Sequence, residues 1–197
     1  MYFGEVTDPN IRHIFRDAGD FIVRPLKCGK FTLYAYAIDG LTSGADTSEY
    51  VIKPITDNLQ GDTIQALYTS ALRGRVYNSV ADPCRDLDTV ALKLVNGFCV
   101  ILFPEAGAIA FEVKTGEKRG ISAPEVENTV KGAKDAFVET VRTNTSLLRR
   151  HLRSPELRLY ETRVGRRSLT NVTVCYVEGI TNPTLVGRMK KRLNDMD

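Results

Sequence analysis

An uninterrupted run of six apolar residues, Phe98-Cys-Val-Ile-Leu-Phe103, is the sequence feature that most constrains the fold. A strand with one face in water alternates apolar and polar side chains, because successive side chains point to opposite faces. A continuous apolar run instead indicates a central strand that is covered on both faces. With the helical segments described below, it predicts an α/β fold with a buried sheet.

Two earlier segments, residues 20–28 and Phe31–Ile38, also have strand character. Gly29-Lys30 between them suits a tight hairpin turn, because glycine accepts positive φ at the first turn position. Pro25 has no N–H to donate to a neighbouring strand, so the first strand is expected at a sheet edge or at a bulge. A further strand is expected at residues 108–113, paired with the central run.

Helices are expected at residues 47–59, 63–72 and 86–96. In the second of these, apolar side chains recur at the i, i+3, i+4 spacing of a buried helical face. Asp86 is suited to cap the third helix through its carboxylate, and Gly97 is suited to end it.

The charge balance changes sign along the chain, which indicates two units. Residues 1–112 hold 10 Lys and Arg against 14 Asp and Glu, whereas residues 113–197 hold 17 against 10. The net charges are therefore −4 and +7. A polar, glycine-bearing linker at residues 115–120 marks the change, and it predicts an N-terminal α/β subdomain (1–114) and a second one (120–197). We expect mixed sheets in both, joined by this short linker.

The second unit is expected to open with a long amphipathic helix over residues 131–152. Its predicted buried face comprises Phe137, Val138, Val141, Leu148 and Leu152. Strands follow at residues 158–164 and 169–177 around Gly165. Thr181-Asn182-Pro183 then predicts a helix start, since proline is tolerated in the first turn.

Catalytic and cofactor motifs are missing from the sequence, so we predict no catalytic, cofactor-binding or metal-binding residue and no enzyme activity. There is no phosphate-binding loop, dinucleotide fingerprint, nucleophile elbow or zinc-protease motif. His13 is expected in solvent or as a cap, and the three aspartates Asp82, Asp86 and Asp88 as a loop and helix cap rather than a metal cluster. The four cysteines form no C-x-x-C pair and fit core positions in a reducing compartment.

Arginine, rather than lysine, dominates the basic residues between positions 142 and 167. The guanidinium is planar and weakly hydrated, which suits bidentate ion pairs and protein interfaces. Three interpretations remain open: intramolecular ion pairs with a solvated face, a protein–protein interface, and a nucleic-acid patch. The last is disfavoured because no aromatic side chains interleave with the arginines.

Several short motifs, taken together in order and spacing, resemble one known family. They are Asp20-Phe-Ile-Val-Arg24, Ile38-Asp-Gly-Leu41, Lys131-Gly-Ala-Lys-Asp-Ala-Phe-Val-Glu139, Asn144 with Leu148-Arg-Arg150, Val164-Gly-Arg-Arg-Ser168 and Cys175-Tyr-Val-Glu-Gly-Ile180. Over residues 20–193 the chain resembles the N-terminal domain of spore germinant-receptor A subunits of the GerA type. The stage V sporulation protein AF group is a close relative of these.

The resemblance implies a soluble module of two small α/β subdomains on the cytoplasmic, or core, side of the spore inner membrane. It implies assembly with A, B and C subunits into a nutrient-gated ion-channel complex, with homo-oligomers of the full-length form and no nucleic acid. Family members continue into membrane helices, so the chain is expected to be a fragment that ends before them. The candidate subunit-interface residues are Arg149, Arg150, Arg153, Arg163, Arg166 and Arg167.

A small-ligand binding module is the alternative function. Its site is expected in the cleft between the two subdomains, because pockets are common where two units meet.

Overall fold

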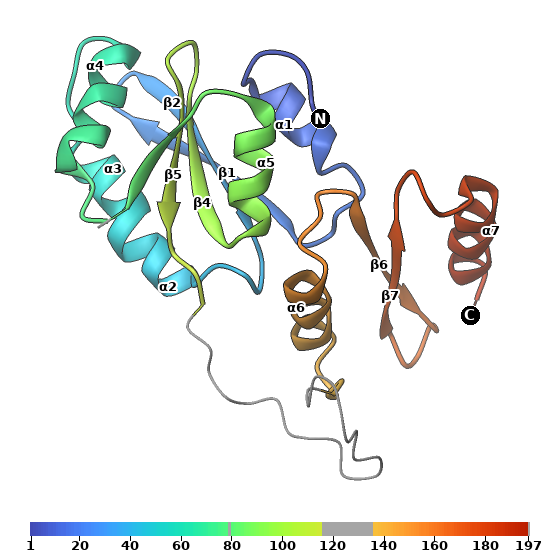
Figure 1. Cartoon of the computed structure of the whole chain (residues 1–197). Helices are drawn as coiled ribbons and strands as arrows, with labels where there is room; N and C mark the ends of the chain where they lie inside the picture. Colours follow the sequence, from blue (N-terminus) through green and yellow to red (C-terminus); the bar gives the residue numbers. More distant parts are fainter. Residues whose placement is uncertain (79, 116–135, 197) are drawn as a thin grey trace, which may run out of the picture.

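A five-stranded sheet forms the centre of residues 1–115 (Figure 1). The computed structural model describes residues 1–78, 80–115 and 136–196. The strands are β1 (Phe21–Cys28), β2 (Phe31–Ile38), β3 (Ala81–Cys84), β4 (Phe98–Phe103) and β5 (Gly107–Glu112). Their order across the sheet is β1-β2-β4-β5-β3.

The predicted hairpin and its edge position are confirmed. β1 pairs with β2 from Phe21↔Ile38 to Cys28↔Phe31, so the turn falls at Gly29-Lys30. β1 is an edge strand, which is where Pro25 can be accommodated without a ladder N–H. The α/β class is also confirmed, but the strand pairs of both sheets are antiparallel rather than mixed. The reason is local: three of these pairs are hairpins joined by short turns, and a hairpin is antiparallel by construction.

Helices cover both faces of the sheet (Figure 1). They are α1 (Asp8–Ile14) and α5 (Leu87–Val95) on one face, and α2 (Gly44–Thr47), a π-helical turn η1 (Ser48–Ile52), α3 (Lys53–Asn58), α4 (Ile64–Ser70) and a second such turn η2 (Ala71–Arg75) on the other. β4 is buried along its whole length, as its apolar run predicts. Its Val100 and Leu102 face the α1/α5 layer, while Ile101 and Phe103 face the α3/α4 layer.

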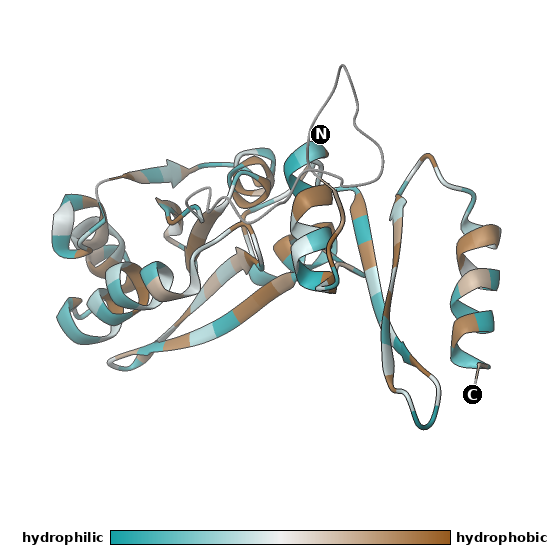
Figure 2. Ribbon diagram, turned by 90° about the horizontal axis from the view of Figure 1, so that it is seen from below, coloured by the Kyte–Doolittle hydropathy of each residue, from teal (hydrophilic) through white to brown (hydrophobic). Residues whose placement is uncertain are grey.

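A second group of elements lies in residues 136–196. It comprises α6 (Val141–His151), β6 (Leu157–Val164), β7 (Thr170–Val177) and α7 (Pro183–Asn194). β6 and β7 form a two-stranded sheet, and the hydrophilic loop between them lies at its far end (Figure 2). The expected subdomain boundary at 114–120 falls almost entirely in residues 116–135, which lie outside the described part, so the division stays a prediction.

The amphipathic helix starts later than predicted. Residues 131–135 are outside the described part, and residues 136–140 precede the helix, which begins at Val141. The side chain of Asn144 explains this start. It accepts from Val138 N at 2.7 Å and donates to Val138 O at 2.6 Å, which takes both backbone groups of Val138 out of helical pairing.

The predicted buried face of α6 is also wrong. Phe137 is 64% exposed and Leu152 is 42% exposed, while the buried positions are Thr145, Ser146, Leu147 and Arg149. Close packing against Gly40 accounts for this choice. A Cβ on Gly40 would lie 1.7 Å from Ser146 Oγ, so the small polar side of α6 sits directly on the turn that follows β2.

Candidate functional site

The candidate site is the junction, which we define as the contact between the five-stranded sheet and residues 136–196. Its centre is a buried ion pair between Asp20, just before β1, and Arg149 on α6. Arg149 Nε lies 2.7 Å from Asp20 Oδ2, and Nη2 lies 2.9 Å from Oδ1. The two side chains are 0% and 1% exposed. Such bidentate geometry fixes both position and orientation, because the guanidinium fork matches the carboxylate.

β6 approaches the sheet next to this ion pair. Gly19 N donates to Leu159 O at 2.9 Å, and a Cβ on Gly19 would lie 2.9 Å from that same oxygen. The absence of a side chain at position 19 therefore allows the two backbones to meet. Arg158, also buried, donates from Nη1 to Ile14 O at 2.8 Å, which links β6 to the end of α1.

Arg158 and Arg16 share the carboxylate of Glu178. Arg158 Nε lies 3.0 Å from Glu178 Oε2, and Arg16 Nη2 lies 2.5 Å from Oε1. Burial opposes the ionisation of Glu178, but hydrogen bonds and positive charge from the two arginines outweigh it and lower its pKa. An outer pair of contacts joins Arg142 of α6 to Asp39 at 3.0 Å and to Glu161 at 2.9 Å.

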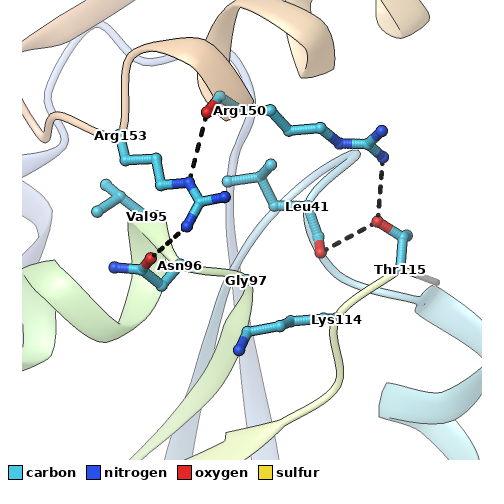
Figure 3. A pocket seen from close by; sticks show the side chains of 8 residues that line it. All are labelled: Leu41, Val95, Asn96, Gly97, Lys114, Thr115, Arg150 and Arg153. Carbon is cyan, nitrogen blue, oxygen red and sulfur yellow. Dashed lines mark hydrogen bonds between the residues drawn. The ribbon is translucent and has the colours of Figure 1, made fainter. Parts of the chain in front are cut away.

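A pocket of about 220 Å³ opens beside the junction (Figure 3). Its lining residues are Leu41, Val95, Asn96, Gly97, Lys114, Thr115, Arg150 and Arg153. They come from the turn after β2, the end of α5, the end of β5 and the end of α6, so both units contribute. The ligand site that we expected between two subdomains stays a prediction.

The six arginines predicted as interface residues lie in three different environments. An interface role does not fit Arg149, because its side chain is fully buried against Asp20 and presents no surface to a partner. Arg150 and Arg153 line the pocket. Arg163, Arg166 and Arg167 are exposed at the far end of the β6–β7 hairpin. β6 has 8 residues, so this group lies about 25 Å from the start of the strand.

The three aspartates considered in the sequence analysis have structural partners. Asp86 accepts from Thr89 N as the N-cap of α5, as predicted, Asp88 accepts from Tyr2 N, and Asp82 is paired with Lys93. His13 is exposed on α1, and Cys28, Cys84 and Cys99 are core residues whereas Cys175 is exposed. Within the described ranges no three His, Cys, Asp or Glu side chains are grouped to hold a metal ion.

Comparison with known proteins gives the family. A model described as Bacillus/Clostridium GerA spore germination protein matches residues 9–197. The chain belongs to the GerA family. Within it, this GerA-family chain is similar to stage V sporulation protein AF of Bacillus subtilis (strain 168), with 34% identity over 127 residues that cover 64% of this chain and 26% of that protein. It is also similar to spore germination protein GerLA of Bacillus cereus, with 28% identity over 193 residues, 94% of this chain and 38% of that protein.

A solved structure has the same fold. It is the N-terminal domain of the A subunit of the Bacillus megaterium spore germinant receptor GerK3, with a TM-score of 0.73 and 20% identity. The alignment covers 95% of this GerA-family chain and 69% of that one. This chain spans well under half the length of stage V sporulation protein AF and of GerLA. Among the helices of the described ranges, none has the length and apolar character needed to span a bilayer.

Several junction residues lie in motifs identified from the sequence, but none of them was predicted to join α6 to the sheet. Asp20, Asp39-Gly40-Leu41, Asn144 and Leu148-Arg149-Arg150 all belong to the segments that carry the GerA resemblance. The structure brings them together: Gly40 packs on α6, and Asp20 binds Arg149. One sequence signal could have identified this contact. The motif that begins with Asp20 carries an acidic residue, and the motif that contains Arg149, 129 residues later, carries a base that can pair with it.

Proposed function

We propose that this chain is an assembly and signal-coupling domain of a germination-receptor A subunit. The complex is a nutrient-gated ion channel of the spore inner membrane, and the domain lies on its cytoplasmic side. Membership of the GerA family supports the receptor assignment. The observation that carries the coupling role is the buried Asp20–Arg149 pair, which ties α6 to the first strand of the sheet.

Coupling needs an element whose displacement at one surface is transmitted to another. The contacts at the junction support such a role because they are directional and short. Arg149 bonds Asp20 through two nitrogens and Ser154 O through a third at 3.0 Å, so the end of α6, the approach to β6 and the start of β1 share one guanidinium. A shift of the β6–β7 hairpin therefore strains bonds at the edge of the five-stranded sheet.

The hairpin end supplies the surface for assembly. Arg163, Arg166 and Arg167 are exposed there, and guanidinium groups suit carboxylates on a neighbouring subunit. The partners we propose are other receptor subunits of the A, B and C types, including further copies of the A subunit. Rim charges of this kind chiefly affect association rate and specificity.

A charge-reversal experiment tests the assembly surface. Arg163, Arg166 and Arg167 are changed to Glu in the intact receptor, and co-purification of the other subunits from spore membranes is measured. The matched control reverses Arg188, Lys191 and Arg192, which are exposed on α7. We expect the hairpin variant to lose most of its co-purifying subunits and the α7 variant to keep them. Equal retention, or equal loss in both variants of a chain that still folds, contradicts the proposal.

A further inference from the structure

The pocket beside the junction has a basic lining. Of the described residues that line it, three are cationic, Lys114, Arg150 and Arg153, and none is acidic. Figure 3 shows Arg150 and Arg153 entering from the end of α6, with Lys114 on the opposite side, next to the end of β5. Like charges gathered in one pocket repel one another, and an anion placed between them lowers that repulsion.

The partners of the two arginines are neutral. Arg150 Nη2 donates to Thr115 Oγ1 at 3.3 Å, and Arg153 Nη1 donates to Asn96 Oδ1 at 3.2 Å. Arg153 Nε donates to Arg150 O at 3.4 Å. Among the described residues neither arginine has an ion-pair partner, whereas Lys114 is paired with Glu112 at 2.7 Å.

Hydrogen-bond length distinguishes Arg150 and Arg153 from Arg149. Arg149 meets a carboxylate at 2.7 and 2.9 Å, the range of charge-assisted hydrogen bonds. The contacts of Arg150 and Arg153, at 3.2–3.4 Å, lie at or beyond the long end of ordinary N–H···O bonds. An oxyanion at this place therefore gains stronger bonds than those it displaces.

We propose that this pocket binds a small oxyanion, the phosphate or carboxylate group of a small solute, between Arg150 and Arg153. The volume of about 220 Å³ is below the ~300–1,000 Å³ of pockets for drug-sized ligands, which fits a compact anion. The carbonyl end of α5 points toward Asn96 and Gly97 and opposes negative charge. The anion therefore lies against the guanidinium groups, on the side away from the helix end.

Binding there joins the two units. Arg150 and Arg153 belong to the α6 segment, while Lys114 and Thr115 follow β5, and Thr115 N donates to Leu41 O at 3.0 Å in the turn that precedes α2. An anion that contacts both sets adds a bridge beside the buried Asp20–Arg149 pair. The folded chain is then stabilised in proportion to ligand concentration.

The test is thermal unfolding of the 197-residue chain with inorganic phosphate or succinate, against sodium chloride at equal ionic strength. We expect a saturable rise in Tm with phosphate or succinate and none with chloride. In the Arg150→Gln/Arg153→Gln variant, the apparent Kd should rise about tenfold or more, because two charge-assisted partners are lost. The matched control, Arg166→Gln/Arg167→Gln, should keep the wild-type Kd.

Backbone amide chemical shifts provide a second measurement that does not depend on stability. Shifts at Gly97 and Thr115 during phosphate or succinate titration support the site, and the anion that gives the lower Kd identifies the preferred group. The proposal is overturned if chloride produces the same rise in Tm, if both double variants lose the response equally, or if neither amide shifts. In those cases the two arginines serve only to neutralise the helix ends.

Discussion

The five-stranded sheet is stabilised mainly by apolar contacts, whereas the junction is stabilised by ion pairs and hydrogen bonds. Around the sheet, apolar side chains form one cluster on each face, and β4 is buried throughout. In residues 136–196 the buried apolar side chains are Leu147, Leu157, Leu159 and Val186. The buried charged side chains of the described residues, Asp20, Arg149 and Arg158, all lie at the junction.

The difference shows how residues 136–196 are fixed to the five-stranded sheet. A two-stranded sheet is marginal by itself, because it buries little apolar surface. Directional bonds then decide where it sits. Apolar contacts tolerate small displacements, whereas a bidentate ion pair has one favourable geometry. The junction therefore sets the orientation of α6 and β6 more than it adds to overall stability, since desolvation offsets most of the attraction.

The largest effect should follow from breaking the buried pair on one side. Asp20→Ala leaves the guanidinium of Arg149 buried without a carboxylate, and we expect a loss of about 3–5 kcal/mol in the free energy of unfolding. Urea denaturation checks this value. The double variant Asp20→Leu/Arg149→Met removes both charges and should recover much of the loss.

The control for this substitution is Asp39→Ala, which removes a partner of Arg142. Asp39 is 45% exposed at its side chain, so its loss should cost less than about 1 kcal/mol. Equal costs for Asp20→Ala and Asp39→Ala would mean that burial at the junction has no special weight.

The fold of the sheet was largely predictable, while the junction was not. The predictions of the central strand and of the hairpin turn rested on local features of the sequence. The apolar run from Phe98 to Phe103 indicates burial on both faces, and Gly29 in the Gly29-Lys30 turn accepts a positive φ. Arg149 looked like a surface residue because its charge and its arginine neighbours are typical of a solvated helix end. Arg149 is buried because the fold places it against Asp20, which lies 129 residues earlier in the chain. The face of α6 was predicted wrongly for a similar reason: Ser146 and Thr145 are polar, and nothing local shows that they pack on Gly40.

A smaller loss is expected when Gly40 acquires a side chain. The Cβ of Gly40→Ala would meet Ser146 Oγ at 1.7 Å, and the residue has φ +81°. We expect a destabilisation of about 2–4 kcal/mol, from overpacking added to backbone strain.

Gly179 provides a matched control for backbone strain alone. It has the same φ of +81°, but no atom lies within 4 Å of the position that a Cβ would take there. Gly179→Ala should therefore cost only about 1–2 kcal/mol. If the two alanine variants unfold at the same urea concentration, α6 does not pack on Gly40 as described.

The outer ion pairs should matter least among the junction contacts. Arg142→Gln removes the bonds to Asp39 and Glu161, and all three side chains are about a third or more exposed. We expect a loss of less than about 1 kcal/mol that shrinks further at high salt. A salt-independent loss as large as that of Asp20→Ala would show that these contacts carry the junction instead.

Acid should weaken the junction by a small additional amount. The pKa of Glu178 in the folded chain lies below its ordinary value of 4.5, so its ionised form stabilises the fold above that pH. This contribution is lost as the pH falls below about 4.5 and through the lowered pKa. The Tm of Glu178→Gln should therefore fall less steeply with acid than that of the wild type. Glu105→Gln, on the exposed β4–β5 turn, should follow the wild-type curve.

Amide hydrogen exchange tests most directly whether the buried ion pair attaches residues 136–196 to the sheet. We compare protection in the wild type and in Asp20→Ala, strand by strand. We expect faster exchange in α6, β6 and β7 of the variant, while β4 and β5 keep most of their protection because their apolar burial is untouched. Unchanged protection in β6 and β7, or a uniform loss that includes β4, would contradict it.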